Sequence, residues 1–225
     1  MNVPAQAHIA CAPVAALLAQ APGTLAWLSA TEQERHASMQ SVRRRAQFIA
    51  ARWQARLLLA DVLGGAPQDW PLAALPDAPP QLLADPALHI SVSHSGDWAA
   101  CALAPVALGL DLEAPGRRRD IDGLVDLCCT PGEQALFAGL DAVRRADLFY
   151  TLWTVKEAWL KRRRAWISPS RLRALDARPA ADGVVRTWAA PQWKLALCIE
   201  GADVRWCGPV PAARDAWQLH DSEAG

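Results

Sequence analysis

The sequence has no excess of either charge, because 23 lysine and arginine residues balance 23 aspartate and glutamate residues. A chain without net charge generates no overall field that would attract nucleic acid or an anionic membrane. Lysine is scarce: Lys156, Lys161 and Lys194 are the only three, so nearly all positive charge is arginine. We therefore expect no nucleic-acid partner, and any bound anion must be met by local arginine clusters or by one of these lysines.

Metal-binding cysteine motifs and long apolar runs are also absent. None of the six cysteines forms a CxxC pair, and no cysteine–histidine cluster has the spacing of a zinc site. The apolar stretch 9–30 precedes the first arginine, Arg35, and is interrupted by Pro13, Pro22 and Gly23, which argues against a signal peptide. No run approaches the length that crosses a bilayer. These absences predict a cytoplasmic protein with reduced thiols and no membrane partner.

Helical and extended segments follow one another in blocks. Residues 31–64 have helical periodicity, with a capping box expected at Thr31 and Glu34 and a glycine stop at the end. The proline-rich stretch 66–86 is expected to be irregular. The remaining expected elements are strands at 89–93, 98–103, 107–113, 187–188 and 193–199, and helices beginning at Thr130 and covering 147–164. This order predicts an α+β fold that could consist of two similar halves, 1–105 and 106–225, although no internal repeat establishes a duplication.

An acidic pair ends one of the expected strands. Asp111 and Glu113 are two residues apart, so both carboxylates project from the same face while Leu112 faces the other way. Two acids on one face of an apolar strand are costly unless a cation neutralises them, and hard oxygen ligands suit Mg²⁺. An exposed strand end is the alternative interpretation of this pair.

Two further segments have functional residues at informative spacing. On the helix 147–164, Glu157 and Lys161 lie one turn apart, so an acid could complete a metal site while the lysine holds a phosphate. An ordinary surface ion pair is the alternative. Ser93, His94 and Ser95 lie where a strand meets a turn, which offers hydroxyls and free backbone N–H groups to phosphate oxygens. The alternatives are a structural turn and a serine nucleophile activated by His94.

The three segments, taken in this order, resemble the signatures of the 4′-phosphopantetheinyl transferases. The matching strings are HISVSHS at 89–95, GLDLE at 109–113 and WTVKEAWLK at 153–161, and RWQARLLL at 52–59 is similar to the arginine-bearing helix of that family. The resemblance covers nearly the whole chain and is to the larger, monomeric, surfactin-synthetase-activating type. It implies a pseudo-twofold fold of two α/β halves with coenzyme A in the cleft between them.

The resemblance also implies an activity and roles for particular residues. The protein would transfer the 4′-phosphopantetheine group of coenzyme A to a serine of an apo acyl or peptidyl carrier protein and release adenosine 3′,5′-bisphosphate. The implied metal ligands, for Mg²⁺, are Asp111, Glu113 and Glu157. The implied contacts to coenzyme A are Arg52, Ser93, His94 and Lys161, with Glu157 and Lys161 as the catalytic residues.

Two departures from the family pattern concern the coenzyme A site. The loop at 77–80 has no lysine where the family often has one, so a phosphate contact is either lost or supplied by an arginine, with 43–45 as the candidates. Beyond Lys161 the family tends to Gly-Lys-Gly, whereas this chain has Arg163, Arg164, Ala165 and Trp166. The shape of that loop is therefore expected to differ.

The carrier protein is expected to dock near the acidic strand. Arg117, Arg118 and Arg119 follow this strand closely, and the segment from Leu124 to Cys129 offers apolar residues beside them. A non-catalytic protein that binds coenzyme A and a carrier is the main alternative. Loss of one of the three acids would favour this alternative, but all three are present. A metal-dependent phosphoesterase is a weaker alternative, because the additional ligands of a two-metal site are absent.

Overall fold

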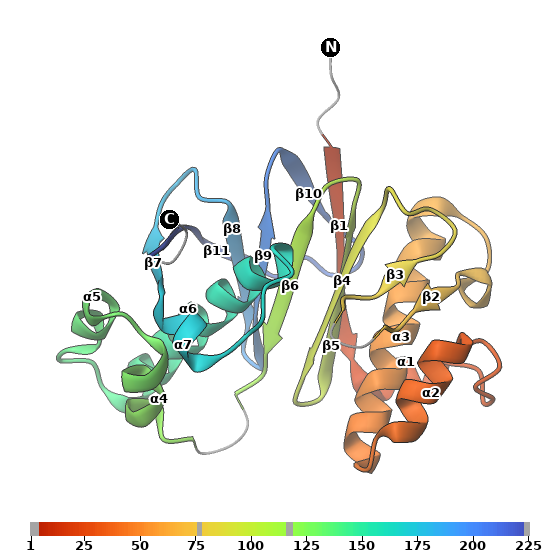
Figure 1. Cartoon of the computed structure of the whole chain (residues 1–225), viewed down its shortest axis with the longest axis horizontal. Helices are drawn as coiled ribbons and strands as arrows, with labels where there is room; N and C mark the ends of the chain where they lie inside the picture. Colours follow the sequence, from red (N-terminus) through yellow and green to blue (C-terminus); the bar gives the residue numbers. More distant parts are fainter. Residues whose placement is uncertain (1–4, 76–77, 116–118, 223–225) are drawn as a thin grey trace.

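The computed structural model describes residues 5–75, 78–115 and 119–222, which form a mixed α+β protein with two sheets side by side (Figure 1). The first sheet has six strands in the order β10-β1-β5-β4-β3-β2, and the second has five in the order β6-β9-β8-β11-β7. The predicted fold of two α/β halves is confirmed. No helix in these ranges combines the length and apolar character needed to cross a bilayer.

The first half consists of residues up to the end of β5. Its strands are β1 (Ala5–Pro13), β2 (Leu72–Ala73), β3 (Gln81–Leu82), β4 (His89–Ser95) and β5 (Trp98–Ala104). Its helices are α1 (Val14–Gln20), α2 (Ala30–Ser38), α3 (Val42–Leu63) and the 3₁₀ turn η1 (Pro67–Asp69). The long helix α3 packs against β5, β4 and β1, so it covers one face of the first sheet.

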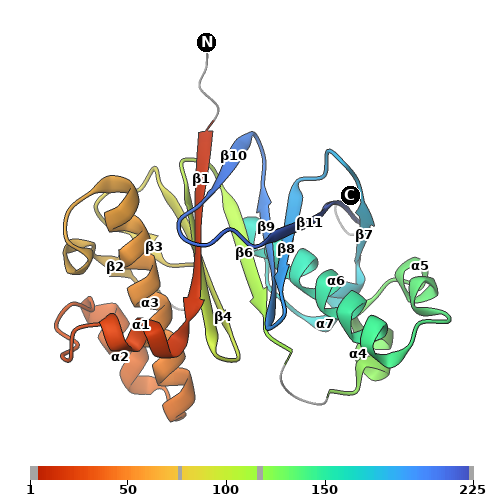
Figure 2. The same cartoon turned by 180° about the vertical axis from the view of Figure 1, so that it is seen from behind.

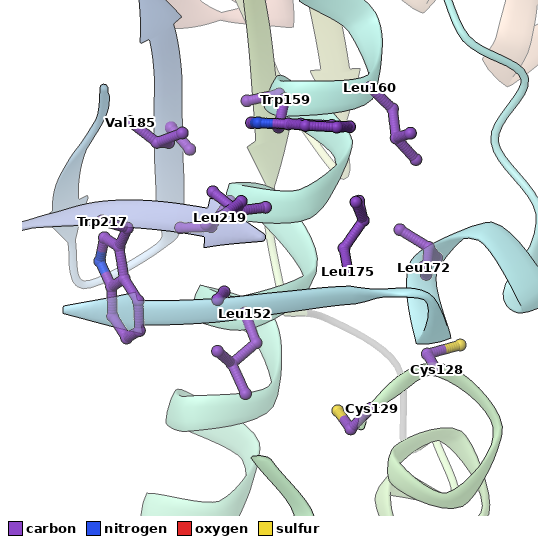
Figure 3. Packing of buried hydrophobic residues seen from close by; sticks show 14 of the residues in the cluster. Cys128, Cys129, Leu152, Trp159, Leu160, Leu172, Leu175, Val185, Trp217 and Leu219 are labelled. Carbon is purple, nitrogen blue, oxygen red and sulfur yellow. The ribbon is translucent and has the colours of Figure 1, made fainter. Parts of the chain in front are cut away.

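The second half places another long helix on another sheet. Its strands are β6 (Leu108–Glu113), β7 (Leu175–Pro179), β8 (Val185–Ala190), β9 (Trp193–Ile199) and β11 (Ala212–Asp221). Its helices are α4 (Ile121–Cys128), α5 (Pro131–Gln134), η2 (Ala135–Phe137), α6 (Ala142–Arg162) and α7 (Pro169–Arg173). Buried side chains gather between α6, the strands β7 and β11, and the end of α4, as Figure 3 shows with Leu152, Trp159, Leu175, Leu219 and Cys128.

One strand departs from a simple division into halves. β10 (Ala202–Trp206) follows β9 in sequence, but it leaves the second sheet and pairs in parallel with β1 of the first (Figure 2). The first sheet otherwise ends at Ala104 and the second begins at Leu108. The predicted division into halves 1–105 and 106–225 therefore stays a proposal. The C-terminal part of the chain contributes β10 as an edge strand of the first sheet, so the two sheets are not formed by separate stretches of sequence.

The predicted helix at 31–64 is two helices, and its predicted start is wrong. Ser29 caps α2 in a box with Glu32, since each side chain hydrogen bonds to the other residue's backbone N–H. The chain then leaves the helical conformation at Met39, and Ser41 caps α3. Glu32 is the one buried residue of α2, so the apolar periodicity that predicted a single long helix comes from α3.

The two sheets meet along β4 and β6 without a shared backbone ladder. Ser91 and Ser93 of β4 are buried, and their hydroxyl oxygens accept hydrogen bonds from the backbone N–H groups of Leu110 and Leu112 at 3.0 and 3.2 Å. These serine hydroxyls replace the carbonyl groups of a neighbouring strand and satisfy N–H groups that would otherwise be buried without a partner. The serine-rich string thus fixes β6, and the acids that it carries, beside the first half.

Candidate active site

A cavity of about 540 Å³ lies between the two halves. One wall comes from α3, β3, β4 and the segment before them, and the other from the start of β6 and the C-terminal end of α6 with the turn that follows. Its polar and charged lining residues include Arg35, Arg52, Ser91, His94, Lys161, Arg162 and Arg164. The cavity thus combines apolar walls with five lysine and arginine side chains, and these cations suit a ligand with several phosphates.

Three carboxylates lie around Lys161, which itself lines the cavity. Asp111 is buried, and its Oδ1 lies 2.5 Å from Nζ of Lys161 and accepts a hydrogen bond from the Ser93 hydroxyl at 3.0 Å. Nζ of Lys161 also lies 3.6 Å from Oε2 of Glu157 on the preceding turn of α6. Glu113 accepts a hydrogen bond from the Ser95 hydroxyl at 2.8 Å. The structure thus brings together acids from β6 and α6 that are more than 40 positions apart in sequence.

The acids repel one another strongly enough to disturb their protonation. Burial and repulsion from Asp111 raise the pKa of Glu157 to about 8, although Lys161 opposes the shift. Burial and the charge of Asp111 also raise the pKa of Glu113, while the hydrogen bond from Ser95 acts in the opposite direction. For Lys161, burial disfavours the ammonium group, but attraction to Asp111 and Glu157 outweighs burial and raises the pKa. A cluster with more negative than positive charge would be stabilised by one further cation.

Whether the three acids fit a metal ion can be judged from their free oxygen atoms. Oδ2 of Asp111 is buried and has no hydrogen-bond partner among the described residues. An orphaned carboxylate oxygen beside two acids with raised pKa values is the donor set that Mg²⁺ prefers. Within the described ranges, however, no three such side chains already stand in a metal-binding arrangement. The ammonium group of Lys161 occupies the other oxygen of Asp111, so the residues fit a cation once that group moves toward a substrate phosphate.

Gly109 allows α6 to approach the strand that carries Asp111. A Cβ atom at Gly109 would lie 2.1 Å from the carbonyl oxygen of Ala158 and 2.3 Å from the backbone nitrogen of Arg162. Both are backbone atoms of the turn of α6 that contains Lys161, so neither can move aside alone. The glycine of the GLDLE string therefore sets the distance between β6 and the helix that supplies Glu157 and Lys161.

Arg52 and Arg56 share one side of α3 as expected but have different surroundings. Arg56 is fully buried, its guanidinium group donates to both oxygens of Glu32 at 3.1 and 2.6 Å, and it also donates to the carbonyl oxygen of Trp27. Arg52 lines the cavity and lies 3.6 Å from Glu32, and its Nη1 has no hydrogen-bond partner among the described residues. Arg56 is structural, whereas Arg52 keeps a donor available for an anion.

His94 lies at the end of β4 and is accessible from the cavity. The cavity walls still remove part of its hydration, and this desolvation lowers the pKa of the imidazole below 6.5. The charges of Lys161, Arg44 and Arg52 lower it further, against a smaller effect of a backbone hydrogen bond. The ring is therefore neutral at pH 7 in the ligand-free protein, and a bound phosphate would favour its protonation.

Lys156 belongs to the same string as Lys161 but faces away from the cavity. Its ammonium group is buried, lies 2.5 Å from Oε2 of Glu133 and donates to the carbonyl oxygens of Cys128 and Leu172 at 3.0 and 2.9 Å. Glu133 also accepts from the backbone N–H groups of Thr130 and Ala177. This ion pair holds α4, α5, α6, α7 and β7 together, and the sequence alone gave no signal that distinguished it from a site residue.

The segment expected to bind a partner is described only in part. Arg117 and Arg118 lie outside the described residues, whereas the guanidinium group of Arg119 lies 5.9 Å from the ring centroid of Tyr150. On α4, Leu127 is half exposed and Leu124 is partly buried, but Cys128 and Cys129 point into the core. The apolar surface expected from Leu124 to Cys129 is therefore smaller than predicted.

Comparison with known proteins shows a family match over the second half of the chain. Residues 107–207 match the model of the 4′-phosphopantetheinyl transferase superfamily. The chain is 31% identical over 143 residues to the Synechocystis sp. protein slr0495, covering 62% of this chain and 58% of that protein. It is 28% identical over 141 residues to a 4′-phosphopantetheinyl transferase of Bacillus subtilis, covering 55% and 60%, and 28% identical over 178 residues to the 4′-phosphopantetheinyl transferase HetI of Nostoc sp., covering 77% and 73%.

The matched region spans less than two thirds of the first two relatives. It nevertheless contains β6 with Asp111 and Glu113, and α6 with Glu157 and Lys161, which together form the cluster beside the cavity. Residues 107–207 thus form a domain that matches the 4′-phosphopantetheinyl transferase superfamily.

Proposed function

We propose that this protein transfers the 4′-phosphopantetheine group of coenzyme A to a serine of an apo acyl or peptidyl carrier protein. The observation that carries the proposal is the cluster of Asp111, Glu113 and Glu157 around Lys161, a lysine that lines a cavity with four arginines. The family and the names of the relatives support it. We include in the proposal the larger, monomeric type and a cytoplasmic location, which agrees with six free cysteines.

Different residues of the cavity would bind different phosphate groups of coenzyme A. Arg52 and His94 would bind phosphate groups along the cavity wall, with Ser93 positioning Asp111 and Lys161 through its hydroxyl. Lys161 would move from Asp111 to the pyrophosphate and stabilise the negative charge that develops on the leaving phosphate oxygen. The arrangement thus supplies positioning and charge neutralisation, which are the main needs of phosphoryl-type displacement.

The acids would bind the metal ion, and one of them would accept the proton of the carrier serine. Asp111, Glu113 and Glu157 would hold Mg²⁺, which neutralises and orients the pyrophosphate oxygens when bound. Glu157 would accept the proton of the serine hydroxyl as its oxygen forms a bond to the β-phosphorus of coenzyme A. The bond from that phosphorus to the bridging oxygen breaks, and adenosine 3′,5′-bisphosphate leaves with the bonding electron pair.

Incubation with coenzyme A, Mg²⁺ and a panel of purified apo carrier proteins tests this function. Intact mass spectrometry should show a mass increase of one phosphopantetheine group on at least one carrier, and none without Mg²⁺. Asp111→Ala should abolish the increase while its circular dichroism spectrum stays unchanged. Tight binding of coenzyme A with no modification of any carrier would instead support the alternative of a non-catalytic binding protein.

Binding of the metal can be measured without turnover. Mg²⁺ should raise the melting temperature of the ligand-free protein by a few degrees, because it binds the folded state through clustered carboxylates. Glu157→Gln should remove this shift, whereas Asp126→Asn, on the exposed side of α4, should retain it. An equal shift in the wild type and in Glu157→Gln would exclude Glu157 as a ligand.

We further propose that the carrier docks on the segment that follows β6. Arg117, Arg118 and Arg119 would attract an acidic carrier, and Leu124 and the half-exposed Leu127 would contact its apolar residues. Changing the three arginines to serine should raise KM for the carrier and weaken its salt dependence, because such attraction acts on association and is screened by salt. KM for coenzyme A should stay unchanged; a change in this constant alone would assign the arginines to the donor site.

A further inference from the structure

Strand β4 directs a serine toward β6 at every second position. Ser91, Ser93 and Ser95 share one face of the strand, because alternate residues of a strand point to the same side. The hydroxyl groups of Ser91 and Ser93 accept hydrogen bonds from backbone N–H groups of β6. Ser95 ends the series, and its hydroxyl donates to Oε2 of Glu113 at 2.8 Å. The last serine of β4 therefore contacts a carboxylate of the candidate metal site.

The three acids of this site are held in different ways. Asp111 and Glu157 lie beside the same lysine, at 2.5 and 3.6 Å from Nζ of Lys161. In the part of the chain that the structure describes, no ion pair involves Glu113, and its hydrogen-bond partner is Ser95. This hydrogen bond stays in place when Lys161 moves toward a substrate phosphate, because the lysine takes no part in it. Ser95 thus orients the one acid that Lys161 does not hold.

The turn that follows Ser95 is fixed against both β6 and α3. Gly96 has a φ of +57°, and a Cβ atom there would lie 2.9 Å from Cβ of Ala114, the residue after Glu113. The carbonyl oxygen of Gly96 accepts a hydrogen bond from the side chain of Gln47 on α3 at 2.7 Å. The backbone beside Ser95 is therefore held from two sides, and its hydroxyl meets Glu113 at a defined position.

Ser95 is poorly placed to bind the donor itself. The described residues that line the cavity include Ser91 and His94 of the same strand but not Ser95. A serine hydroxyl has one hydrogen to donate, and Glu113 accepts it, so Ser95 would have to leave this carboxylate to donate to a phosphate oxygen. Its contacts point to a role toward the acid.

We propose that Ser95 is a positioning residue for the metal ion: its hydrogen bond holds one oxygen of Glu113 and keeps the other available as a ligand for Mg²⁺. The inference rests on the proposed function, which makes Glu113 a metal ligand. Removing a residue that contacts a metal ligand, but not the metal, typically weakens metal binding by roughly 10- to 100-fold. The affinity for Mg²⁺ should therefore depend on the Ser95 hydroxyl.

Calorimetric titration of the ligand-free protein with Mg²⁺ alone tests this role. Ser95→Ala removes the hydroxyl and should raise Kd for Mg²⁺ about tenfold, the lower end of that range, because water can reach the half-buried Glu113. Ser95→Thr keeps a hydroxyl on a β-branched side chain that suits a strand. Its Kd should stay within about twofold of the wild-type value.

Ser91→Ala is the matched control, because it removes a hydroxyl of β4 that contacts the backbone of β6 rather than an acid. The buried N–H group of Leu110 would lose its acceptor, so the melting temperature should fall. Kd for Mg²⁺ should nevertheless stay within about twofold of the wild type. Equal increases of Kd in Ser91→Ala and Ser95→Ala would assign the effect to the contact between the sheets and overturn the role of Ser95.

The Mg²⁺ dependence of transfer gives a second readout. In Ser95→Ala the Mg²⁺ concentration at half-maximal rate should rise about tenfold, while kcat at saturating Mg²⁺ changes less than about twofold. A fall in kcat with an unchanged Mg²⁺ dependence would also overturn the proposal, because it would assign Ser95 to the reacting groups.

The outcomes separate this inference from the proposed function. Binding of Mg²⁺ that is lost in Asp111→Ala but equal in Ser95→Ala and the wild type would overturn the role of Ser95 alone. A wild-type protein that binds no Mg²⁺ would overturn both proposals.

Discussion

Lys161 neutralises Asp111 in the ligand-free protein, with 2.5 Å between Nζ and Oδ1 and only 3% of the Asp111 side chain exposed. Because the same lysine would serve the pyrophosphate during transfer, its two partners compete for one ammonium group. Replacing Lys161 with alanine should therefore lower kcat by roughly 10²- to 10³-fold, the scale of losing one charge-stabilising donor. It should weaken coenzyme A binding much less. Rapid-quench turnover and calorimetric Kd values measure the two effects separately.

Arg52→Ala is the matched comparison for Lys161→Ala. In the proposed function its guanidinium group would contact a phosphate that does not react, so its loss should weaken binding of coenzyme A and leave kcat nearly unchanged. A Lys161→Ala variant that behaves in the same way, with normal kcat and raised Kd, would show that Lys161 only anchors the donor.

Gly109→Ala should damage the site without touching a side chain of it. The added Cβ would lie 2.1 Å from the carbonyl oxygen of Ala158, so α6 must move away from β6. We expect the free energy of unfolding to fall by about 3 kcal/mol, near the upper end for overpacking. Transfer should fall further than stability explains, because Glu157 and Lys161 move with the helix. Urea unfolding and activity at low temperature measure the two losses.

Gly23→Ala is a suitable control, because a Cβ at Gly23 would meet no atom within 4 Å. Its free energy of unfolding should stay within about 0.5 kcal/mol of the wild type, as is usual for surface substitutions. A Gly109→Ala protein with wild-type stability and turnover would contradict the close approach of α6 to β6.

Lys156→Met should destabilise the fold and leave the chemistry intact. In the wild type, Nζ of Lys156 lies 2.5 Å from Oε2 of Glu133. The substitution removes this ammonium group and leaves the buried carboxylate of Glu133 without a counter-charge. Breaking a buried ion pair in this way costs about 3–5 kcal/mol. The second change Glu133→Gln should recover part of the loss, because it removes the uncompensated charge. Equal stability of Lys156→Met and the wild type by urea unfolding would refute the structural role.

The fold class and the residues of the cluster around Lys161 could be predicted from the sequence, because both depend on short-range patterns. Spacing of two along β6 and of four along α6 determines the directions of Asp111, Glu113, Glu157 and Lys161. The order of the three strings then identified the family. Spacing could not predict the ion-pair partner of each lysine. Lys156 and Lys161 have similar sequence contexts, but Lys156 pairs with Glu133 in the core, whereas Lys161 pairs with Asp111 and lines the cavity.

Several elements escaped prediction for reasons of tertiary structure. β1 is rich in alanine, which has low strand propensity, and becomes a strand because it pairs on both sides with β5 and β10. The helix start was placed two residues late because Thr31 and Glu34 match the capping pattern as well as Ser29 and Glu32 do. Glu32 is selected because only its side chain can also reach the buried Arg56.

Binding of the donor should be linked to uptake of a proton by His94. Desolvation, Lys161, Arg44 and Arg52 lower its pKa below 6.5 in the ligand-free protein, so the ring is neutral at pH 7. A phosphate beside the ring favours the imidazolium form and raises the pKa, and binding therefore becomes tighter as pH falls between the free and bound values. Calorimetry at pH 7 in two buffers of different ionisation enthalpy measures the protons taken up.

The substitution His94→Gln distinguishes protons taken up by the imidazole ring from protons taken up by the phosphate itself. It should reduce the proton uptake measured with coenzyme A, and uptake equal to that of the wild type would rule out His94. In the absence of ligand, His94 binds a proton more readily in the unfolded chain than in the folded protein. The free energy of unfolding therefore decreases as pH falls below 6.5. His94→Gln should remove that part of the decrease.

The pairing of β1 with β10 has a consequence for how the protein is made. Ala5 and Ala202 are register partners, so β1 cannot pair on this edge until a strand almost 200 residues later has been synthesised. During this interval one edge of β1 is open, and a nascent chain with an unpaired edge is prone to associate with other chains. The first sheet therefore cannot be completed before β10 has been translated, so the framework that supports the cavity closes only after most of the second half has been synthesised.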